Sequence, residues 1–295
     1  MAQKIEKVGV LGAGLMGHGI TQVAAETGYT VVVREVDDAT LQKGLGKIEK
    51  QLARAVEKEK ATQEQADEVR GRIEGTTDYG ALADCDLVIE AITESLPLKL
   101  EMWKEIDAIV KPEAVFATNT SSLAVIDQAA STGRPEKFVG LHYFNPAQVM
   151  KLVEVIRCVT TGDEAFATAL QFARSEGKLA IPTQDKAGFI VNRLLVPYLL
   201  DAIRAYEEGV GSVSEIDDAM KAGAGHPMGP LTLADFVGLD TMGAVSDVMF
   251  EEFRERRFAR PPLLRKMLAA GWYGRKSGVG FYDYSGEAPV ENPGI

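Results

Sequence analysis

The stretch VGVLGAGLMGHGI near the amino terminus constrains the fold more than any other part of the chain. Gly12, Gly14 and Gly17 have the spacing G-x-G-x-x-G, directly after a Val-rich strand pattern and at the start of a helical pattern. Three glycines could form an ordinary turn. In this context, however, they allow a tight turn, close approach of a pyrophosphate, and close packing of the helix on the strand. The stretch therefore predicts a dinucleotide site, with Leu15 and Met16 in its loop.

An acidic residue about twenty positions beyond such glycines is expected to hydrogen-bond a ribose hydroxyl. Glu35 holds this position at the end of the strand pattern YTVVVREV. Arg34 beside it could instead accommodate the extra phosphate of NADP, but alternation along the strand should turn the two side chains to opposite faces. We therefore expect NAD as the cofactor.

Val- and Ile-rich runs alternate with helical patterns over the first half of the chain, which predicts a parallel sheet. The strand candidates are KVGVLG, YTVVVREV, DLVIEAI, AVFATNT, KFVGLHYF, KLVEVI and KLAIP. Beyond about residue 185 the patterns are helical, and the final GEAPVENPGI is expected to be a loose tail. We predict an α/β Rossmann-type dinucleotide-binding domain over residues 1–185 and an all-α domain over residues 186–295.

Residues 38–72 form an excursion too long for a simple crossover, and they are rich in Lys, Glu, Gln and Ala. This composition predicts two helices. Thr62 and Gln65 have the spacing of a capping box for the second helix.

The formal net charge of −11 argues against a nucleic-acid partner or an anionic membrane, so we expect a small-molecule partner. Cys85 and Cys158 stand far apart, which is typical of buried free thiols in a reducing compartment and does not indicate a metal site. The amino terminus lacks a signal-peptide pattern, and the apolar run LLVPYLL is too short to span a bilayer. These features predict a cytoplasmic protein.

A nicotinamide cofactor implies hydride transfer, and oxidation of an alcohol also needs a base, most often histidine. The chain has three histidines. His18 lies in the glycine-loop helix, where it is expected to line the cofactor phosphates or face solvent. His226 lies in a Pro/Gly-rich turn and is expected to be structural. His142, inside the strand pattern KFVGLHYF, is the remaining candidate.

Glu154 lies inside the apolar strand pattern KLVEVI, where an unpaired charge would be costly. His142 could be its partner, because a carboxylate bound to one imidazole nitrogen fixes the tautomer and leaves the other nitrogen for substrate. A purely structural ion pair is the alternative. Asn119, Ser121 and neighbouring hydroxyls end the strand AVFATNT, where they could bind a ligand or cap the next helix.

With these residues assembled, the chain resembles the 3-hydroxyacyl-CoA dehydrogenase family, especially its stand-alone bacterial members that act on 3-hydroxybutyryl-CoA. The resemblance runs nearly end to end and rests on GAGLMGHGI, DLVIEAITE, ATNTSSL, GLHYFNP, MKLVEVI, GFIVNRLL, GHPMGPLTLADFVGLD and GRKSGVGFYDY. It implies NAD-dependent, reversible oxidation of a short-chain (S)-3-hydroxyacyl-CoA to the 3-ketoacyl-CoA, for example 3-hydroxybutyryl-CoA to acetoacetyl-CoA. It also implies a homodimer.

The resemblance implies roles for individual residues. His142 is the general base, Glu154 orients it, and Ser121 and Asn192 contact the substrate near the reacting centre. The positions that would contact the cofactor, besides the glycine loop and Glu35, are Glu94, Lys99, Asn119, Ser121 and Lys276.

The family's helical excursion helps to hold coenzyme A. Lys50, Arg54 and Lys58 continue a basic stripe that begins at Lys47, at i, i+3 and i+4 steps of a helix. These cations would bind the phosphates of coenzyme A. A solvated helix face is the alternative, since acidic residues such as Glu49 are interleaved.

The chain departs from the family beside the site, because members often read HFFNPVP where this chain reads HYFNPAQ. The departure bears on acyl-chain preference and leaves the reaction class unchanged. Two rival interpretations are a free β-hydroxyacid dehydrogenase, which typically uses a lysine in catalysis, and a non-catalytic NAD-binding or structural protein of the same fold. The histidine–glutamate pair and the long excursion argue against the first. The complete set of Ser121, His142, Glu154 and Asn192 argues against the second.

Overall fold

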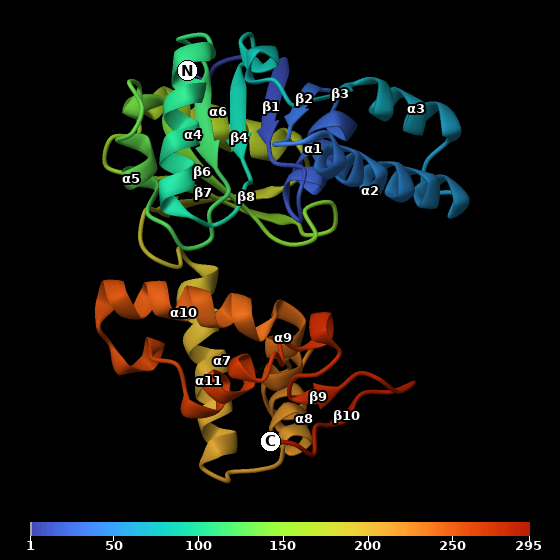
Figure 1. The fold of residues 1–295 in the computed structure, drawn as a ribbon, viewed down its shortest axis with the longest axis vertical. Helices are drawn as coiled ribbons and strands as arrows, with labels where there is room; N and C mark the ends of the chain where they lie inside the picture. Colours follow the sequence, from blue (N-terminus) through green and yellow to red (C-terminus); the bar gives the residue numbers. More distant parts are fainter. Residues whose placement is uncertain (1) are drawn as a thin grey trace. The chain divides into compact units, whose positions relative to one another are not determined.

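The computed structural model describes residues 2–295, which divide into two compact units (Figure 1). The first unit ends at Lys186 and the second comprises Ala187–Ile295. The first is built on an eight-stranded sheet with the order β3-β2-β1-β4-β5-β6-β7-β8. Its strands are β1 (Lys7–Leu11), β2 (Thr30–Arg34), β3 (Ile73–Thr76), β4 (Leu87–Glu90), β5 (Val115–Thr118), β6 (Phe138–Tyr143), β7 (Leu152–Arg157) and β8 (Leu179–Gln184). The sequence patterns predicted all of these except β3, whose residues IEGT lack an apolar run.

Neighbouring strands are parallel except for β6 and β7, which are antiparallel, so the prediction of a wholly parallel sheet was wrong at this pair. Only residues 144–151 lie between these strands. A parallel return needs a crossover of about a dozen residues or more, so this connection can only turn back. The resulting register places His142 directly opposite Glu154.

Helices cover both faces of the sheet. α1 (Gly17–Thr27) and α6 (Asp163–Ser175) pack on one face, and α4 (Leu96–Ile109) packs with α5 (Val125–Ala129) on the other. Successive strand residues point to opposite faces. Accordingly, Val115 and Ala117 of β5 share a core with Phe172 of α6, whereas Phe116 stacks on Trp103 of α4 with ring centroids 5.1 Å apart.

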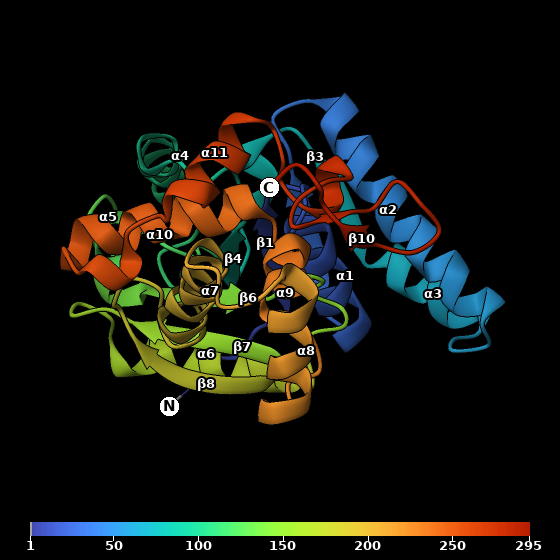
Figure 2. The same ribbon diagram turned by 90° about the horizontal axis from the view of Figure 1, so that it is seen from below.

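The excursion forms two helices, α2 (Asp38–Glu57) and α3 (Gln63–Gly71), which extend together from the β1–β3 side of the sheet (Figures 1 and 2). The predicted capping box of Thr62 and Gln65 is present at the start of α3. α2 packs tightly against the glycine loop at Gly44, where an added Cβ would lie 2.6 Å from the carbonyl oxygen of Ala13. The excursion is therefore fixed close to the loop after β1.

The second unit is mainly helical. Its α-helices are α7 (Val191–Glu207), α8 (Val213–Ala224), α9 (Pro230–Val237), α10 (Leu239–Phe253) and α11 (Pro262–Ala269). Short 3-10 turns lie at η3 (Arg256–Phe258) and η4 (Arg275–Ser277). Gly238 has a φ of +98° and separates α9 from α10. Helices in a right-handed conformation cannot continue through such a residue.

The end of the chain is more ordered than the sequence suggested, and the second unit is not entirely helical. β9 (Tyr282–Asp283) and β10 (Val290–Glu291) form an antiparallel pair. Asn292 donates from Nδ2 to the carbonyl of Gly280 at 2.8 Å, and the Tyr206 hydroxyl donates to the carbonyl of Ile295 at 3.1 Å. The expectation of a loose tail was therefore wrong, because side-chain hydrogen bonds fix a segment that has little apolar content.

Cys85 and Cys158 are both buried and free, as predicted. Burial raises the pKa of the Cys85 thiol to about 12, which makes it a poor nucleophile. Every helix between residues 2 and 295 is too short or too polar to pass through a bilayer.

Candidate active site

The glycine loop joins β1 to α1, and the absence of a side chain serves a different purpose at each of its three glycines. Gly12 has a φ of +93° and donates its N–H to the carbonyl of Arg34 at 2.8 Å. A Cβ on Gly17 would lie 1.8 Å from the carbonyl oxygen of Gly12. A Cβ on Gly14 would meet no nearby atom of the described chain within 4 Å. The fold itself needs the first and third glycines, whereas the second leaves open space that suits a pyrophosphate.

The loop ends beside the two charged residues that bear on cofactor choice. Glu35 is only 9% exposed, and its Oε1 accepts a hydrogen bond from the Ala13 backbone N–H at 2.7 Å. The Arg34 guanidinium lies 3.8 Å from the centroid of the Tyr79 ring, and its Nε donates to the carbonyl of Thr77 at 3.2 Å. The two side chains point to different segments, as alternation along the strand predicted.

A hydrogen-bonded line of three side chains lies at the edge of the sheet where β5 and β6 end. His142 Nδ1 is 2.7 Å from Glu154 Oε2, and His142 Nε2 is 3.2 Å from Ser121 Oγ. His142 is 3% exposed and Glu154 is 1% exposed. Because a carboxylate can only accept, Nδ1 is the donor in this pair, and Nε2 is left to face the Ser121 hydroxyl. The contact between His142 and Glu154 that the sequence suggested is thus confirmed.

The neighbouring residues hold the imidazole in place. The Asn119 side chain accepts a hydrogen bond from the Tyr143 backbone N–H at 2.9 Å, at the point where the β5–β6 ladder has ended. The Phe144 ring lies with its centroid 4.6 Å from that of His142. Asn119, predicted to bind the cofactor, therefore also braces the strand that carries the histidine.

Glu94 holds the segment that contains Ser121. Its Oε1 accepts hydrogen bonds from the Thr120 hydroxyl at 2.5 Å and from the backbone N–H groups of Ser121 at 3.0 Å and Ser122 at 3.2 Å. Its Oε2 lies 2.8 Å from Lys99 Nζ. Burial alone would raise the pKa of Glu94, but the Lys99 charge and these hydrogen bonds outweigh it and lower the pKa. The carboxylate is therefore ionised near neutral pH.

Lys99 is only 1% exposed, and its ammonium lies 2.8 Å from carboxylate oxygens of both Glu90 and Glu94. The predicted contact of Lys99 with the nucleotide stays a prediction. Sequence reasoning also missed Glu90. The signal was available, since Glu90 is an acidic residue ending an apolar strand pattern, the same observation that singled out Glu154.

The other two histidines have structural contacts. His18 is 8% exposed, with Nδ1 2.6 Å from the carbonyl of Gly14 and Nε2 3.3 Å from Gln51 Nε2 on α2. It does not face solvent, contrary to one expectation, and burial lowers its pKa so that the ring is neutral. His226 Nδ1 lies 3.0 Å from the Tyr198 hydroxyl, consistent with the expected structural role.

The remaining predicted residues lie elsewhere. Lys50 and Arg54 are exposed on α2, and Lys58 caps its end. Asn192 is in the first turn of α7 in the second unit. Lys276 is in η4 of the same unit and forms an ion pair with Asp240. Their functional roles stay predictions.

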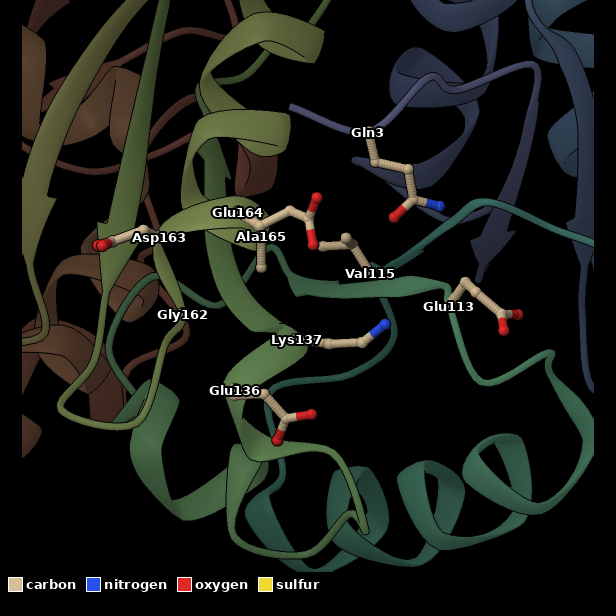
Figure 3. A pocket seen from close by; sticks show the side chains of 9 residues that line it. All are labelled: Gln3, Glu113, Val115, Glu136, Lys137, Gly162, Asp163, Glu164 and Ala165. Atoms are coloured by element: carbon tan, nitrogen blue, oxygen red, sulfur yellow. The ribbon is translucent and has the colours of Figure 1, made fainter. Parts of the chain in front are cut away.

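A shallow pocket lies at the opposite edge of the sheet, where β5 begins (Figure 3). The residues that line it include Glu113, Glu136, Asp163 and Glu164 together with Lys137. No group of His, Cys, Asp and Glu side chains in residues 2–295 is arranged to hold a metal ion. The carboxyl edge of the sheet is the candidate active site, in keeping with ligand binding in other open α/β sheets.

A glycine loop suited to a dinucleotide and a histidine–carboxylate pair on the same sheet define a nicotinamide-dependent dehydrogenase with a helical second unit. Residues 7–186 match the family model described as 3-hydroxyacyl-CoA dehydrogenase, NAD binding domain, and residues 188–284 match the corresponding C-terminal domain. The chain belongs to the 3-hydroxyacyl-CoA dehydrogenase family. The prediction of an α/β Rossmann-type unit followed by a helical unit is confirmed.

Similar proteins agree with this assignment. The chain is 46% identical to 3-hydroxybutyryl-CoA dehydrogenase of Bradyrhizobium diazoefficiens, over 98% of this chain and 99% of that protein. It is 48% identical to a probable 3-hydroxybutyryl-CoA dehydrogenase of Deinococcus radiodurans, over 94% of this chain and all of that protein. The crystal structure of (S)-3-hydroxybutyryl-CoA dehydrogenase from Ralstonia eutropha matches with a TM-score of 0.93 and 43% identity, covering 96% of this chain and 100% of that one.

Proposed function

We propose that this protein catalyses the NAD-dependent, reversible oxidation of (S)-3-hydroxybutyryl-CoA to acetoacetyl-CoA. The observation that carries the proposal is the buried line of Ser121, His142 and Glu154 at the carboxyl edge of a sheet whose glycine loop suits a dinucleotide. The names of the relatives support the substrate, since three similar proteins are described as 3-hydroxybutyryl-CoA dehydrogenases.

In this proposal, His142 Nε2 takes the proton of the substrate hydroxyl. The chemistry that bound NAD would supply is acceptance of the hydride from the same carbon, with NADH as the hydride donor in the reverse reaction. Glu154 holds the Nδ1–H at 2.7 Å and stabilises the imidazolium that forms. Ser121 Oγ, 3.2 Å from Nε2, is placed to hydrogen-bond the reacting oxygen. In the reverse direction the Nε2–H protonates that oxygen.

The cofactor would lie across the loop of Gly12, Gly14 and Gly17, with Leu15 and Met16 along its rim. Leu15 is 66% exposed at the tip of this loop, so its side chain is available for contact. Glu35 supports NAD over NADP, because it is positioned beside the loop while Arg34 is engaged with Tyr79. Lys276, Glu94 and Lys99 are further proposed cofactor contacts.

Coenzyme A would be held in part by Lys50, Arg54 and Lys58. Support comes from their exposure on α2 and from Glu49, an acidic residue within the stripe, which pairs with Arg70 of α3 at 3.1 Å. That pairing turns one interleaved negative charge away from the stripe. Asn192 would contact the substrate near the reacting centre, and a homodimer stays a prediction from the family resemblance.

The proposal is tested by following nicotinamide absorbance with acetoacetyl-CoA and either NADH or NADPH, with free acetoacetate as the matched control substrate. We expect turnover with acetoacetyl-CoA and NADH, and much slower turnover in the other combinations. Preference for free acetoacetate would favour a β-hydroxyacid dehydrogenase. Absence of turnover with both cofactors, and with longer 3-ketoacyl-CoA esters, would contradict the proposed function.

A further inference from the structure

A buried ion pair joins the end of β4 to the start of α4. The Glu90 carboxylate, which is fully buried, lies 2.8 Å and 2.9 Å through its two oxygens from Lys99 Nζ. It also accepts hydrogen bonds from the Thr118 hydroxyl at 2.6 Å and from the Ile92 backbone N–H at 2.8 Å. Glu90 is thus fixed from three directions, and it fixes the lysine in turn.

Stability alone does not explain this pair. Removing two charges from water costs several kcal/mol each, and replacing a buried ion pair by apolar residues is often neutral or stabilising. In some proteins, buried ionic groups instead fix one particular geometry. Burial raises the pKa of Glu90 even against the Lys99 charge, which indicates how costly its ionised form is.

The lysine connects this pair to the histidine through a continuous set of contacts. Lys99 Nζ lies 2.8 Å from Glu94 Oε2, and Glu94 Oε1 accepts the Ser121 backbone N–H at 3.0 Å. Ser121 Oγ then lies 3.2 Å from His142 Nε2. The contacts therefore run without a break from Glu90 to His142.

We propose that Glu90 and Lys99 are positioning residues for the proton-transfer site. Held by Glu90, Lys99 fixes Glu94, and Glu94 holds the Ser121 backbone so that its hydroxyl faces His142. The inference rests on the proposed function, since proton transfer at His142 is what the placement of Ser121 serves.

A double-mutant cycle tests whether Lys99 acts on the proton-transfer site through Ser121. Lys99→Met is introduced into the natural chain and into Ser121→Ala, and kcat with acetoacetyl-CoA and the Kd for NADH are measured for each. We expect Lys99→Met alone to lower kcat about tenfold or more, because small displacements of a positioned group are costly. In the Ser121→Ala background, the same change should cost less than about twofold, because residues acting as a unit are non-additive.

Lys104→Met is the matched control, since Lys104 is an exposed lysine on the same helix. It should leave kcat and NADH affinity unchanged. If Lys99→Met fails to fold, Glu90→Gln/Lys99→Met replaces it, because the double variant leaves no unpaired charge at the Glu90–Lys99 contact. Equal losses of kcat in both backgrounds, or a raised NADH Kd with unchanged kcat, would overturn the proposal.

A spectroscopic readout separates this inference from the proposed function. The chain has only three histidines, so NMR of ¹⁵N-histidine-labelled protein resolves His142 with His18 and His226 as internal references. Lys99→Met should shift the His142 ring signals, whereas Lys104→Met should not. In the Ser121→Ala background, adding Lys99→Met should leave the His142 signals where they are. This result is independent of turnover, so an inactive natural chain would refute only the function. Unshifted His142 signals in folded Lys99→Met would refute the positioning role.

Discussion

Replacing Glu176 by glutamine should change how the stability of the first unit depends on pH. Glu176 Oε2 accepts a hydrogen bond from the Tyr143 hydroxyl at 2.6 Å, whereas Oε1 is inaccessible to solvent and has no hydrogen-bond partner within residues 2–295. Burial raises the pKa of Glu176 to about 8, against the opposing effects of the Tyr143 hydrogen bond and the Lys178 charge. The folded protein therefore holds this carboxyl protonated at neutral pH.

The sign of the effect follows from the two pKa values. The folded-state pKa of about 8 lies above the ordinary value of 4.5, so between these limits the folded chain binds a proton that the unfolded chain has lost. Stability then falls as pH rises, by about 1.4 kcal/mol per pH unit within the window. From pH 5.5 to 7.5, the free energy of unfolding should fall by roughly 3 kcal/mol relative to Glu176→Gln, which cannot titrate.

Urea unfolding at pH 5.5, 6.5 and 7.5 measures this difference. The chain has two tryptophans, Trp103 in the first unit and Trp272 in the second, so a Trp272→Phe background restricts the fluorescence signal to the unit that contains Glu176. Glu113→Gln, at an exposed loop position, is the matched control and should follow the parent chain. Parallel pH dependence of the parent chain and Glu176→Gln would refute the raised pKa.

Three further predictions concern the cofactor and the CoA ester. Glu35→Ala should raise the NADH Kd by roughly 10- to 100-fold, which corresponds to the loss of a hydrogen bond to a charged group. Fluorescence titrations should also show a smaller preference for NADH over NADPH. Equal weakening of NADH and NADPH binding would contradict the ribose contact. Lys50→Ala/Arg54→Ala should raise KM for acetoacetyl-CoA and leave KM for NADH unchanged, and equal changes would argue for a solvated face. Gly17→Ala should lower the free energy of unfolding by roughly 1–3 kcal/mol. Gly14→Ala should leave the free energy of unfolding unchanged and still weaken NADH binding. Unaltered stability of Gly17→Ala would contradict the close approach of Gly17 to the Gly12 carbonyl.

Local patterns were sufficient for much of the fold. The glycine loop and seven of the strands could be predicted because each has a distinct local signature: fixed glycine spacing in one case and short Val/Ile-rich runs in the other. β3 was missed because an edge strand with exposed, polar residues carries no such signature. The split between α9 and α10 depends on the backbone conformation of Gly238, which an apolar periodicity does not reveal.

The candidate site was predictable where a buried charge demanded a partner. The charge of Glu154 in an apolar strand pointed to His142, and the antiparallel register of β6 and β7 places the two opposite each other. Glu90 needed a partner for the same reason, but its strand pattern did not identify one. Lys99 reaches Glu90 from a helix, so the pairing depends on how α4 packs on the sheet. Contacts that depend on packing between elements are not encoded in local spacing.

The central claim is that His142, oriented by Glu154, moves the hydroxyl proton. The most direct test measures kcat for acetoacetyl-CoA reduction and the NADH Kd in His142→Gln and Glu154→Gln, with circular dichroism to verify folding. We expect His142→Gln to lower kcat by roughly 10²–10⁴-fold, the typical contribution of general acid–base catalysis. Glu154→Gln should also lower kcat, and the NADH Kd should stay unchanged in both variants. A folded His142→Gln variant with near-normal kcat would contradict the claim.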